Sequence, residues 1–568
     1  MRRRRFLSGA AAGALCPGAP AGATASAKDQ GRAGARRRVL FVAVDGMDAA
    51  MIRRYASDLP NMRRMMAEGY SGRILPYVSC WGNIGFMSML TGATVGTQYR
   101  ERMPDGGEPP HRQCVAETIW RALASEGRRS LLLDFPGARP GLHTATIQGF
   151  TLQGGTVYQT ADVQLEGAYR KGLETTGWPP GGGPRPGRRW TVVETPKAVF
   201  GWPGLPASNR PPLETTAGPW QAVVLAAGSA YDTVAVFDTR AGREIARTSA
   251  GAWSDWGQVR WKGRDARVRF HLLEAAAGGR RLQLLQSPVV AAGGFSEPAG
   301  LAPKLVADLG PPTSGSAIPP APFDPFWETG EAEALDGAMW AAEAAAETLK
   351  LWDWDFFLYK ASLTDAAMHQ CLTLADPSYH SHDPETGRRA GAVQRRVFID
   401  MDRFAGRLLE VAAASGDMAV VVASDHGGGV NNVVCDVNRL LEKAGLLAMA
   451  GGEIDWSRTR AYTKRNRQGT EIFINLKGRE PGGIVEPSGL EAAQEEVIDA
   501  LLDWRGPIGN KRAIAYALKL RDAALLGYWG AEAGDVQFCY NPGFVWGVNP
   551  GGEAIARSTS PIANHGPQ

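Results

Sequence analysis

Short apolar runs, each followed by an acidic residue, constrain the possible fold of this chain more than any other feature of its sequence. One run covers residues 39–44 and is followed by Asp45, and another covers residues 418–424 and is followed by Asp425. Runs of this length and composition are typical of the buried strands of a parallel sheet. Because open α/β sheets build their sites at the carboxyl ends of such strands, both aspartates are candidate site residues.

Four further residues have types that suit metal coordination. Asp365 and His369 lie four positions apart and would share one face of a helix. His426 directly follows the second aspartate and precedes three glycines, and His565 lies in AsnHisGly close to the C-terminus. Carboxylates and imidazoles are ligands of Zn²⁺ and of neighbouring transition metals. Each residue alone is explained as a cap, turn or surface residue, so their combination and order carry the prediction of a metal site.

The remaining pattern predicts an α/β protein with an insertion. Residues 38–184 and 327–568 alternate apolar runs with helical patterns, including expected helices over residues 48–64 and 331–349. This alternation predicts a mixed, mostly parallel sheet sandwiched by helices. Residues 185–305 instead contain short alternating runs separated by turn residues, which predicts a β-rich inserted domain.

The N-terminus has the features of an export signal in their usual order. Residues 3–7 read RRRFL, which has the twin-arginine form, and a weakly apolar stretch rich in Ala and Gly follows. Residues 25–27 read ASA, a cleavage pattern of small residues. We therefore expect residues 1–27 to be a twin-arginine signal peptide, and we expect the mature protein to be periplasmic or secreted.

Charge and composition exclude several kinds of partner. The formal net charge is +4, and part of it lies in the export segment and in the ArgArgArg run at 36–38, so the mature chain is close to neutral. It has no basic footprint for nucleic acid. No apolar run approaches the roughly 20 residues of a transmembrane helix. Apolar residues make up 44% of the chain and charged residues 21%, which is ordinary for a soluble protein with a large core.

With these residues placed, the chain resembles the alkaline phosphatase superfamily, and most closely its bacterial type I phosphodiesterase/nucleotide pyrophosphatase branch. The resemblance implies an alkaline-phosphatase-like fold and covers most of the mature chain. A further stretch, GAWSDW at 251, resembles a motif in the β-rich insertion of some members. The stretches that carry the resemblance are FVAVDGMD at 41, MLTGATVGTQ at 89, SLTDAAMH at 362, SDHGGG at 424, EIFINLKGREPGGIV at 471, GDVQF at 534 and NHG at 564.

The resemblance also implies a cofactor of two divalent metal ions, zinc in the first place and manganese as the alternative. Two such ions would clamp the attacking and leaving oxygens of an in-line displacement. In the superfamily, the counterparts of Asp45, Asp425 and His426 bind one ion together with the nucleophile, and the counterparts of Asp365, His369 and His565 bind the other.

The nucleophile is the position where this sequence departs from the family pattern. The family places Thr or Ser about nine residues before the ThrGly that matches residues 91–92, and that position here is Gly82. Ser79 lies just upstream and is the chemically conservative choice. Cys80 resembles the modified cysteine of sulfatases but lacks the Pro and Arg that follow it there. Asn83 would either donate a hydrogen bond to a phosphoryl oxygen or cap a helix. A chain without a nucleophile is the remaining alternative.

We therefore expect an exported, metal-dependent hydrolase of phosphodiester, pyrophosphate or phosphonate bonds, with a small-molecule or a lipid or glycan phosphoester as its substrate. One alternative is a phosphomonoesterase or phospho-group transferase that acts on envelope glycans or lipids. Another is a catalytically inactive, metal-binding envelope protein. The absence of arginine from residues 74–99 favours a diester, which carries less charge. Relatives extend beyond the HisGly at 565–566, so the sequence leaves open that it is a fragment.

Overall fold

The computed structural model describes most of the chain from Arg37 onward. The chain divides into two units, Met1–Arg37 and Arg38–Gln568, and the predicted signal peptide at 1–27 lies outside the described residues. In the part that is described, no helix combines the length and apolar character needed to cross a bilayer. The described residues are 37–74, 84–94, 97, 114–161, 189–202, 205, 210–240, 242–276, 278–313, 327–464, 470–530, 533–549, 551–559 and 563.

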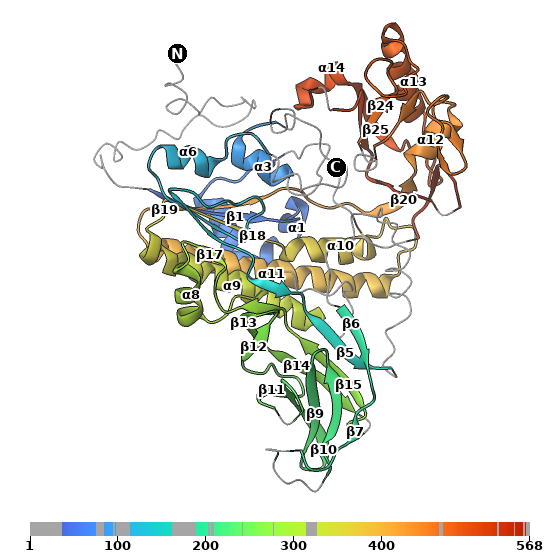
Figure 1. Ribbon diagram of the computed structural model, residues 1–568. Helices are drawn as coiled ribbons and strands as arrows, with labels where there is room; N and C mark the ends of the chain where they lie inside the picture. Colours follow the sequence, from blue (N-terminus) through green and yellow to red (C-terminus); the bar gives the residue numbers. More distant parts are fainter. Residues whose placement is uncertain are drawn as a thin grey trace. The chain divides into compact units, whose positions relative to one another are not determined.

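A mixed, mostly parallel six-stranded sheet carries the ends on which the site is built (Figure 1). Its strand order is β17-β3-β2-β18-β1-β19, and every neighbouring pair is parallel except β17 with β3. The predicted sheet type is therefore confirmed. The strands are β1 (Arg38–Val44), β2 (Ser130–Leu133), β3 (Thr144–Ile147), β17 (Ser296–Glu297), β18 (Phe356–Ala361) and β19 (Met418–Ser424).

Side chains that alternate along the strands pack against helices on both faces of this sheet, as expected for a period of two. Leu40 and Val42 of β1 belong to a core cluster with α9 and α11, whereas Ala43 belongs to a second cluster with α3 and α6. Figure 1 shows these two pairs of helices on opposite sides of the sheet. The helices are α3 (Ile84–Thr91), α6 (Ile119–Ser125), α8 (Leu301–Leu309), α9 (Trp327–Trp352) and α11 (Pro384–Ala414).

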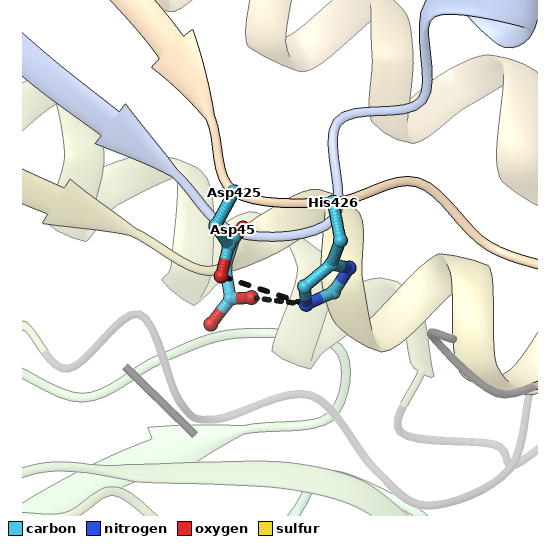
Figure 2. A group of neighbouring side chains, drawn as sticks. All are labelled: Asp45, Asp425 and His426. Atoms are coloured by element: carbon cyan, nitrogen blue, oxygen red, sulfur yellow. Dashed lines mark ion pairs between the residues drawn. The ribbon is translucent and has the colours of Figure 1, made fainter. Parts of the chain in front are cut away.

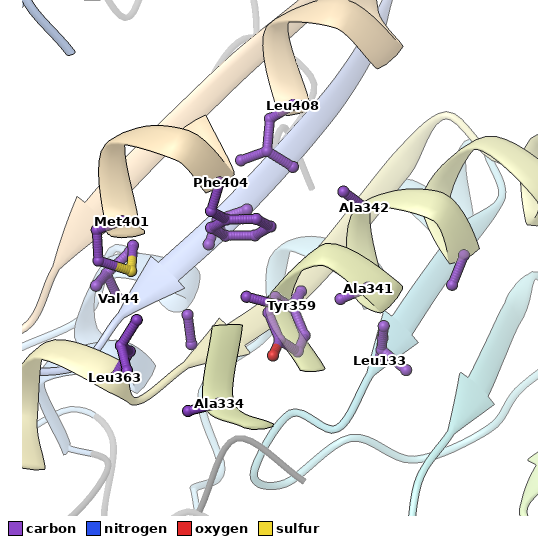
Figure 3. Packing of buried hydrophobic residues seen from close by; sticks show 14 of the residues in the cluster. Val44, Leu133, Ala334, Ala341, Ala342, Tyr359, Leu363, Met401, Phe404 and Leu408 are labelled. Atoms are coloured by element: carbon purple, nitrogen blue, oxygen red, sulfur yellow. The ribbon is translucent and has the colours of Figure 1, made fainter. Parts of the chain in front are cut away.

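Small residues of α9 allow it to lie close to β18. Ala341 and Ala342 belong to the same buried cluster as Tyr359 of β18 and Phe404 of α11 (Figure 3). The rings of Tyr359 and Phe404 meet edge to face, with centroids 6.1 Å apart. Because truncating a buried aromatic side chain to Ala typically costs about 3–5 kcal/mol, such contacts contribute strongly to fixing β18 and the site residues that follow it.

The predicted helix over residues 48–64 is wrong in one respect, because two helices occupy this region. Helix α1 (Ala49–Arg54) and helix α2 (Pro60–Glu68) are separated by a 3₁₀ turn at Ala56–Asp58. Pro60 stands in the first turn of α2, where its missing N–H costs nothing, but its ring disfavours continuing a preceding helix. The backbone N–H of Met62 then donates to the carboxylate of Asp402 in α11, at 2.7 Å.

Three further sheets contain the short strands between residues 151 and 291. Their orders are β11-β10-β9-β8-β7, β12-β13-β16-β4 and β14-β15-β5-β6. Two of these strands, β4 and β5, precede residue 185 in the sequence and pair with β16 and β15. The strands are β4 (Thr151–Gln153), β5 (Thr156–Thr160), β6 (Arg189–Val193), β7 (Lys197–Ala198), β8 (Leu213–Ala217), β9 (Trp220–Ala227), β10 (Ala230–Phe237), β11 (Glu244–Ser249), β12 (Gly257–Trp261), β13 (Arg264–Val268), β14 (Phe270–Ala276), β15 (Arg281–Gln286) and β16 (Val289–Ala291).

The chain after β19 adds another sheet, of order β23-β24-β26-β25, whose own apolar cluster includes residues of α12 and α13. Strand β20 pairs with β27 and β28 in a smaller sheet, and β21 pairs with β22. The elements are α10 (Leu363–Ala375), β20 (Asn431–Cys435), α12 (Val437–Lys443), β21 (Met449–Ala450), β22 (Glu453–Ile454), β23 (Ala461–Tyr462), β24 (Glu471–Ile474), a 3₁₀ turn (Pro487–Gly489), α13 (Leu490–Leu502), β25 (Ile514–Lys519), α14 (Leu520–Ala523), a second 3₁₀ turn (Ala524–Leu526), β26 (Val536–Tyr540), β27 (Gly543–Trp546) and β28 (Ile555–Arg557).

Candidate metal centre

Two neighbouring strands bring three of the predicted ligands together. β1 and β19 pair in parallel, with Val44 opposite Ser424, so the residues that follow each strand emerge side by side. Asp45, Asp425 and His426 each offer a ligand atom there, and these atoms all lie within 4.8 Å of one another (Figure 2). This is the largest part of the predicted constellation that the described residues place at a single point.

The imidazole of His426 faces the two carboxylates with one nitrogen and the backbone with the other. Its Nε2 lies 3.2 Å from Asp45 Oδ1 and 3.5 Å from Asp425 Oδ2. Its Nδ1 lies 3.0 Å from the carbonyl oxygen of Gly427. A histidine that ligates a metal usually directs its other ring nitrogen at a carbonyl or carboxylate, which fixes the ring orientation and the tautomer. The ring of His426 is therefore oriented as a metal ligand requires.

Hydrogen bonds connect the loops that follow β1 and β19. Ser424 Oγ accepts from the backbone N–H of Met47 and donates to the carbonyl oxygen of His426, both at 2.9 Å. Asp48 Oδ1 accepts from the first N–H groups of α1, and its Oδ2 accepts from Gly428 N at 3.2 Å. The loop after β1 and the loop after β19 are thus held together by side-chain hydrogen bonds from both sides.

A second pair of predicted ligands lies on α10. His369 Nε2 is 3.4 Å from Asp365 Oδ1, and its Nδ1 is 2.7 Å from the carbonyl oxygen of Ala563. The backbone N–H of Ala563 in turn donates to the carbonyl oxygen of His369 at 2.9 Å. His369 therefore has the same arrangement as His426, with Nδ1 at a carbonyl oxygen and Nε2 at a carboxylate.

Two glycines let other parts of the chain approach the carboxylates. Gly46 has a φ of +67°, and a Cβ placed on it would lie 2.7 Å from the Cα of Asp365. A Cβ on Gly85, in the first turn of α3, would lie 2.9 Å from the Cβ of Asp425. The loop after β1 therefore lies against the start of α10, and the start of α3 lies against the end of β19.

Lys360 is a site residue that sequence reasoning missed. Its Nζ lies 2.6 Å from Asp45 Oδ2, and its side chain is only 6% exposed. The ammonium also lies over the ring of Phe86 in α3, 5.3 Å from its centroid. The sequence did contain a signal for this residue, because a lysine near the end of the apolar strand FFLYKA is unusual. Since buried lysines are almost always paired, such a lysine indicates a nearby carboxylate.

The surroundings of the three carboxylates shift their pKa values in opposite directions. Burial would raise the pKa of Asp45, but the hydrogen bond from His426 and the charge of Lys360 hold it well below its usual range. Burial, followed by the charge of Asp45, raises the pKa of Asp425 to about 7 and also raises the pKa of Asp365. Burial would lower the pKa of His426, but its hydrogen bond to Asp45 and the charge of Asp425 raise it to about 9.

These residues fit a divalent cation. The carboxylates of Asp45, Asp365 and Asp425 raise one another's free energy, and a cation among them would relieve that repulsion. Asp365 Oδ1 is buried and accepts no hydrogen bond from the described residues, a condition that a bound cation would correct. Two carboxylates and one imidazole within bonding reach form a donor set that suits zinc and manganese.

A comparison with protein families shows to which family the chain belongs. The model of the type I phosphodiesterase/nucleotide pyrophosphatase family matches residues 261–568, which is more than half of the chain. The chain belongs to this family. Membership identifies it as a hydrolase of the phosphodiesterase/nucleotide pyrophosphatase type, and the predicted phosphodiesterase branch and enzyme class are confirmed.

Several solved structures resemble this phosphodiesterase-family chain at low identity, whereas no curated protein matches it. Phosphonoacetate hydrolase from Sinorhizobium meliloti 1021 aligns in complex with phosphonoformate (TM-score 0.43, 12% identity) and with phosphonoacetate (TM-score 0.42, 13% identity), each covering 94% of this chain and 87% of that chain. Wild-type alkaline phosphatase PafA aligns with a TM-score of 0.39 and 13% identity, covering 93% of this chain and 89% of that chain.

The predicted ligands of this family member are thus placed in part. Asp45, Asp425 and His426 lie together, and Asp365 and His369 lie together on α10. The remaining predicted site residues, Ser79, Cys80, Asn83 and His565, lie outside the described residues.

Proposed function

We propose that this family member is an exported, two-metal hydrolase of phosphodiester, pyrophosphate or phosphonate bonds. The observation that carries the proposal is the shared arrangement of His426 and His369. Each directs Nδ1 at a backbone carbonyl oxygen and Nε2 at a carboxylate. Two histidines prepared in this way, on neighbouring elements of one site, support two metal positions rather than one.

In this proposal, Asp45, Asp425 and His426 hold the first ion, and Asp365, His369 and His565 hold the second. The assignment of His565 is supported by Ala563, which lies two residues earlier in the sequence. Ala563 is 1% exposed, exchanges two hydrogen bonds with His369, and shares an apolar cluster with Met368. The chain is therefore fixed beside α10 shortly before the proposed ligand.

Ser79 is the proposed nucleophile, with Cys80 as the alternative and Asn83 as a hydrogen-bond donor to the phosphoryl group. Support comes from Gly85, which lies six residues after Ser79 in the sequence. A Cβ on Gly85 would lie 2.9 Å from the Cβ of Asp425, so the chain reaches the metal centre directly after the proposed nucleophile segment.

Bound metal ions would supply charge that stabilises the attacking and leaving oxygens of an in-line displacement. The contribution of the chain is to hold the carboxylates and imidazoles in place before the substrate binds, so that little reorganisation is needed. Zinc is the proposed metal and manganese the alternative, since both accept carboxylate and imidazole ligands. A small-molecule or a lipid or glycan phosphoester is the proposed substrate.

We also keep two predictions about the organisation of the chain as proposals. Residues 1–27 would direct export through the twin-arginine pathway to the periplasm or the medium, which suits a protein that folds and takes up metal before crossing the membrane. Residues 185–305 would form a β-rich domain inserted between the two parts of the core, 38–184 and 327–568.

The test is hydrolysis of bis-p-nitrophenyl phosphate by the purified mature chain, with p-nitrophenyl phosphate alongside. We expect the diester to be cleaved faster, and we expect chelation, Asp425→Ala and Ser79→Ala each to lower the rate at least a hundredfold. Glu453→Ala, on an exposed strand end, is the matched control and should retain full activity. Faster cleavage of the monoester would instead identify a phosphomonoesterase. Bound metal without cleavage of either compound would contradict the proposed activity.

A further inference from the structure

Lys360 lies inside the metal centre but has no place in the proposed ligand set. An ammonium cannot ligate a divalent cation, and a positive charge beside a metal position weakens metal binding unless it has another task. The side chain is 6% exposed, so simple solvation does not explain it. Its position beside a ligand therefore needs a physical account.

The two oxygens of Asp45 have different neighbours. Oδ2 lies 2.6 Å from the Nζ of Lys360, whereas Oδ1 lies 3.2 Å from His426 Nε2, and this nitrogen also lies 3.5 Å from Asp425 Oδ2. Lys360 thus occupies one oxygen of the carboxylate, and the other oxygen faces the imidazole of His426.

The packing around Lys360 holds its ammonium in this position. The lysine is on β18, which pairs directly with β1, and Ala43 lies opposite Lys360 in the register. Its Nζ lies over the Phe86 ring of α3, at 5.3 Å from the centroid. A buried ammonium between an aromatic face and a carboxylate has few alternative positions, because leaving either one would cost solvation that the interior does not supply.

We propose that Lys360 is a positioning residue that restricts Asp45 to a single ligating oxygen, Oδ1. A carboxylate can bind a cation through one oxygen or through both. With the ammonium on Oδ2, ligation through both oxygens would require breaking a buried ion pair, so the one-oxygen mode is favoured. Lys360 thereby limits the coordination number of the first ion and leaves room for a substrate oxygen. The inference rests on the proposed function, because it requires a bound metal.

A purely structural role gives a different expectation. If Lys360 only neutralised a buried carboxylate for folding, its replacement would lower stability but would leave the ligands of the bound metal unchanged. The coordination of the metal is therefore the property to measure, rather than activity alone.

The experiment is the visible absorption of Co²⁺ bound to the full mature chain, compared among the wild type, Lys360→Met and Lys360→Arg. Co²⁺ accepts the same ligands as zinc, and its d–d bands weaken and shift as the coordination number rises. We expect a weaker band in Lys360→Met, because Oδ2 becomes available, and a band close to that of the wild type in Lys360→Arg, which keeps a charged donor. Lys350→Met, at a lysine that is 69% exposed, is the matched control.

An unchanged Co²⁺ spectrum in Lys360→Met, with metal bound in the same amount, would overturn the inference and leave the proposed function intact. A wild-type chain that binds no Co²⁺ or Zn²⁺ would overturn the proposed function itself. If Lys360→Met does not fold, Lys360→Gln offers a shorter, neutral donor, and its spectrum should lie between those of the wild type and a site with both oxygens ligating. A spectrum of Lys360→Gln identical to that of the wild type would also contradict the inference.

Discussion

Gly46 shows how a single residue lets the loop after β1 approach the start of α10. Its backbone has a φ of +67°, and a Cβ there would lie 2.7 Å from the Cα of Asp365. A backbone atom cannot move away as the end of a side chain can, so a larger residue must separate the loop after β1 from α10. The close approach of Asp45 and Asp365 therefore depends on a residue without a side chain.

We expect Gly46→Ala to lower both stability and metal affinity. Gly445→Ala is the matched control, because Gly445 has a φ of +70° and nothing within 4 Å of its would-be Cβ. A left-handed conformation at Ala costs about 1–2 kcal/mol, and this cost is common to both variants. Any additional loss of stability or zinc affinity in Gly46→Ala measures the effect of the contact with Asp365. Equal unfolding free energies and equal zinc affinities of the two variants would contradict this explanation.

The pKa values of the metal centre predict that metal binding releases protons. In the metal-free site, the pKa of His426 is raised to about 9 and that of Asp425 to about 7. Ligands must lose their protons to bind a metal, so protons compete with the cation below these pKa values. We expect apparent zinc affinity to fall as the pH is lowered from 9 to 6. Titration calorimetry in buffers of different ionisation enthalpy counts the protons, and an affinity that is constant over this range would refute the prediction.

Sequence predicted which strand-end carboxylates and imidazole lie together better than it predicted their surroundings. Asp45, Asp425 and His426 follow apolar runs whose strand character is clear from composition, and parallel neighbours place their ends side by side. Lys360 was missed because its partner lies 315 positions away by residue number, and only the pairing of β18 with β1 shows that they meet. Pairing between distant strands is not written in any local pattern.

At the scale of elements, the GAWSDW stretch at 251 connects the β-rich sheets to α9. The guanidinium of Arg269 lies 4.4 Å from the ring centroid of Trp253 and 5.0 Å from that of Trp256. It also pairs with two acidic residues of α9, Glu333 at 3.9 Å and Asp336 at 3.5 Å. The tryptophans of this stretch thus contact an arginine that pairs with α9, so they take part in the packing between the β-rich sheets and this helix.

Arg269→Ala should therefore destabilise the chain without impairing the metal centre. Removing it takes away two cation–π contacts and a partner of Glu333, whose side chain is 2% exposed, so we expect a loss of about 2–3 kcal/mol. Arg260→Ala is the control, because its pair with Asp265 is exposed and such pairs contribute little. Chemical denaturation measures both variants, and hydrolysis at low temperature should stay within twofold of the wild type. An equal loss of unfolding free energy in Arg269→Ala and Arg260→Ala would contradict this account.

Element types were more predictable than element boundaries. The long helix expected over residues 331–349 is present as α9 (Trp327–Trp352), which begins four residues earlier and ends three residues later. The single helix expected over 48–64 is divided, because Pro60 begins a new helix and the acceptor that holds it, Asp402, is on α11. A tertiary contact of this kind decides where a helix starts, and it cannot be read from the segment itself.

At the scale of the whole molecule, the order of strands was beyond prediction, although the sheet type was not. The site is assembled from β1, β18 and β19, which are adjacent in the sheet but separated in the sequence by the β-rich region and the long helices. Residues from several distant segments meet there, including Ala563 close to the C-terminus. Binding of metal should therefore stabilise the native chain as a whole, because the proposed ligands come together only after folding.

We expect chelation to lower the unfolding temperature of the mature chain and added zinc to restore it. A ligand that binds only the native state stabilises it by about 2.7 kcal/mol at a hundredfold excess over its dissociation constant. The native site without metal holds Asp45, Asp365 and Asp425 in mutual repulsion, so chelation removes favourable charge interactions as well.

Asp425→Asn relieves part of this repulsion and weakens metal binding. This variant should therefore unfold at a similar or higher temperature than the chelated wild type, and it should gain much less from zinc. Calorimetric scans of both chains, with and without zinc, measure the two effects separately. A zinc-dependent increase of the same size in Asp425→Asn would show that the stabilising metal binds elsewhere.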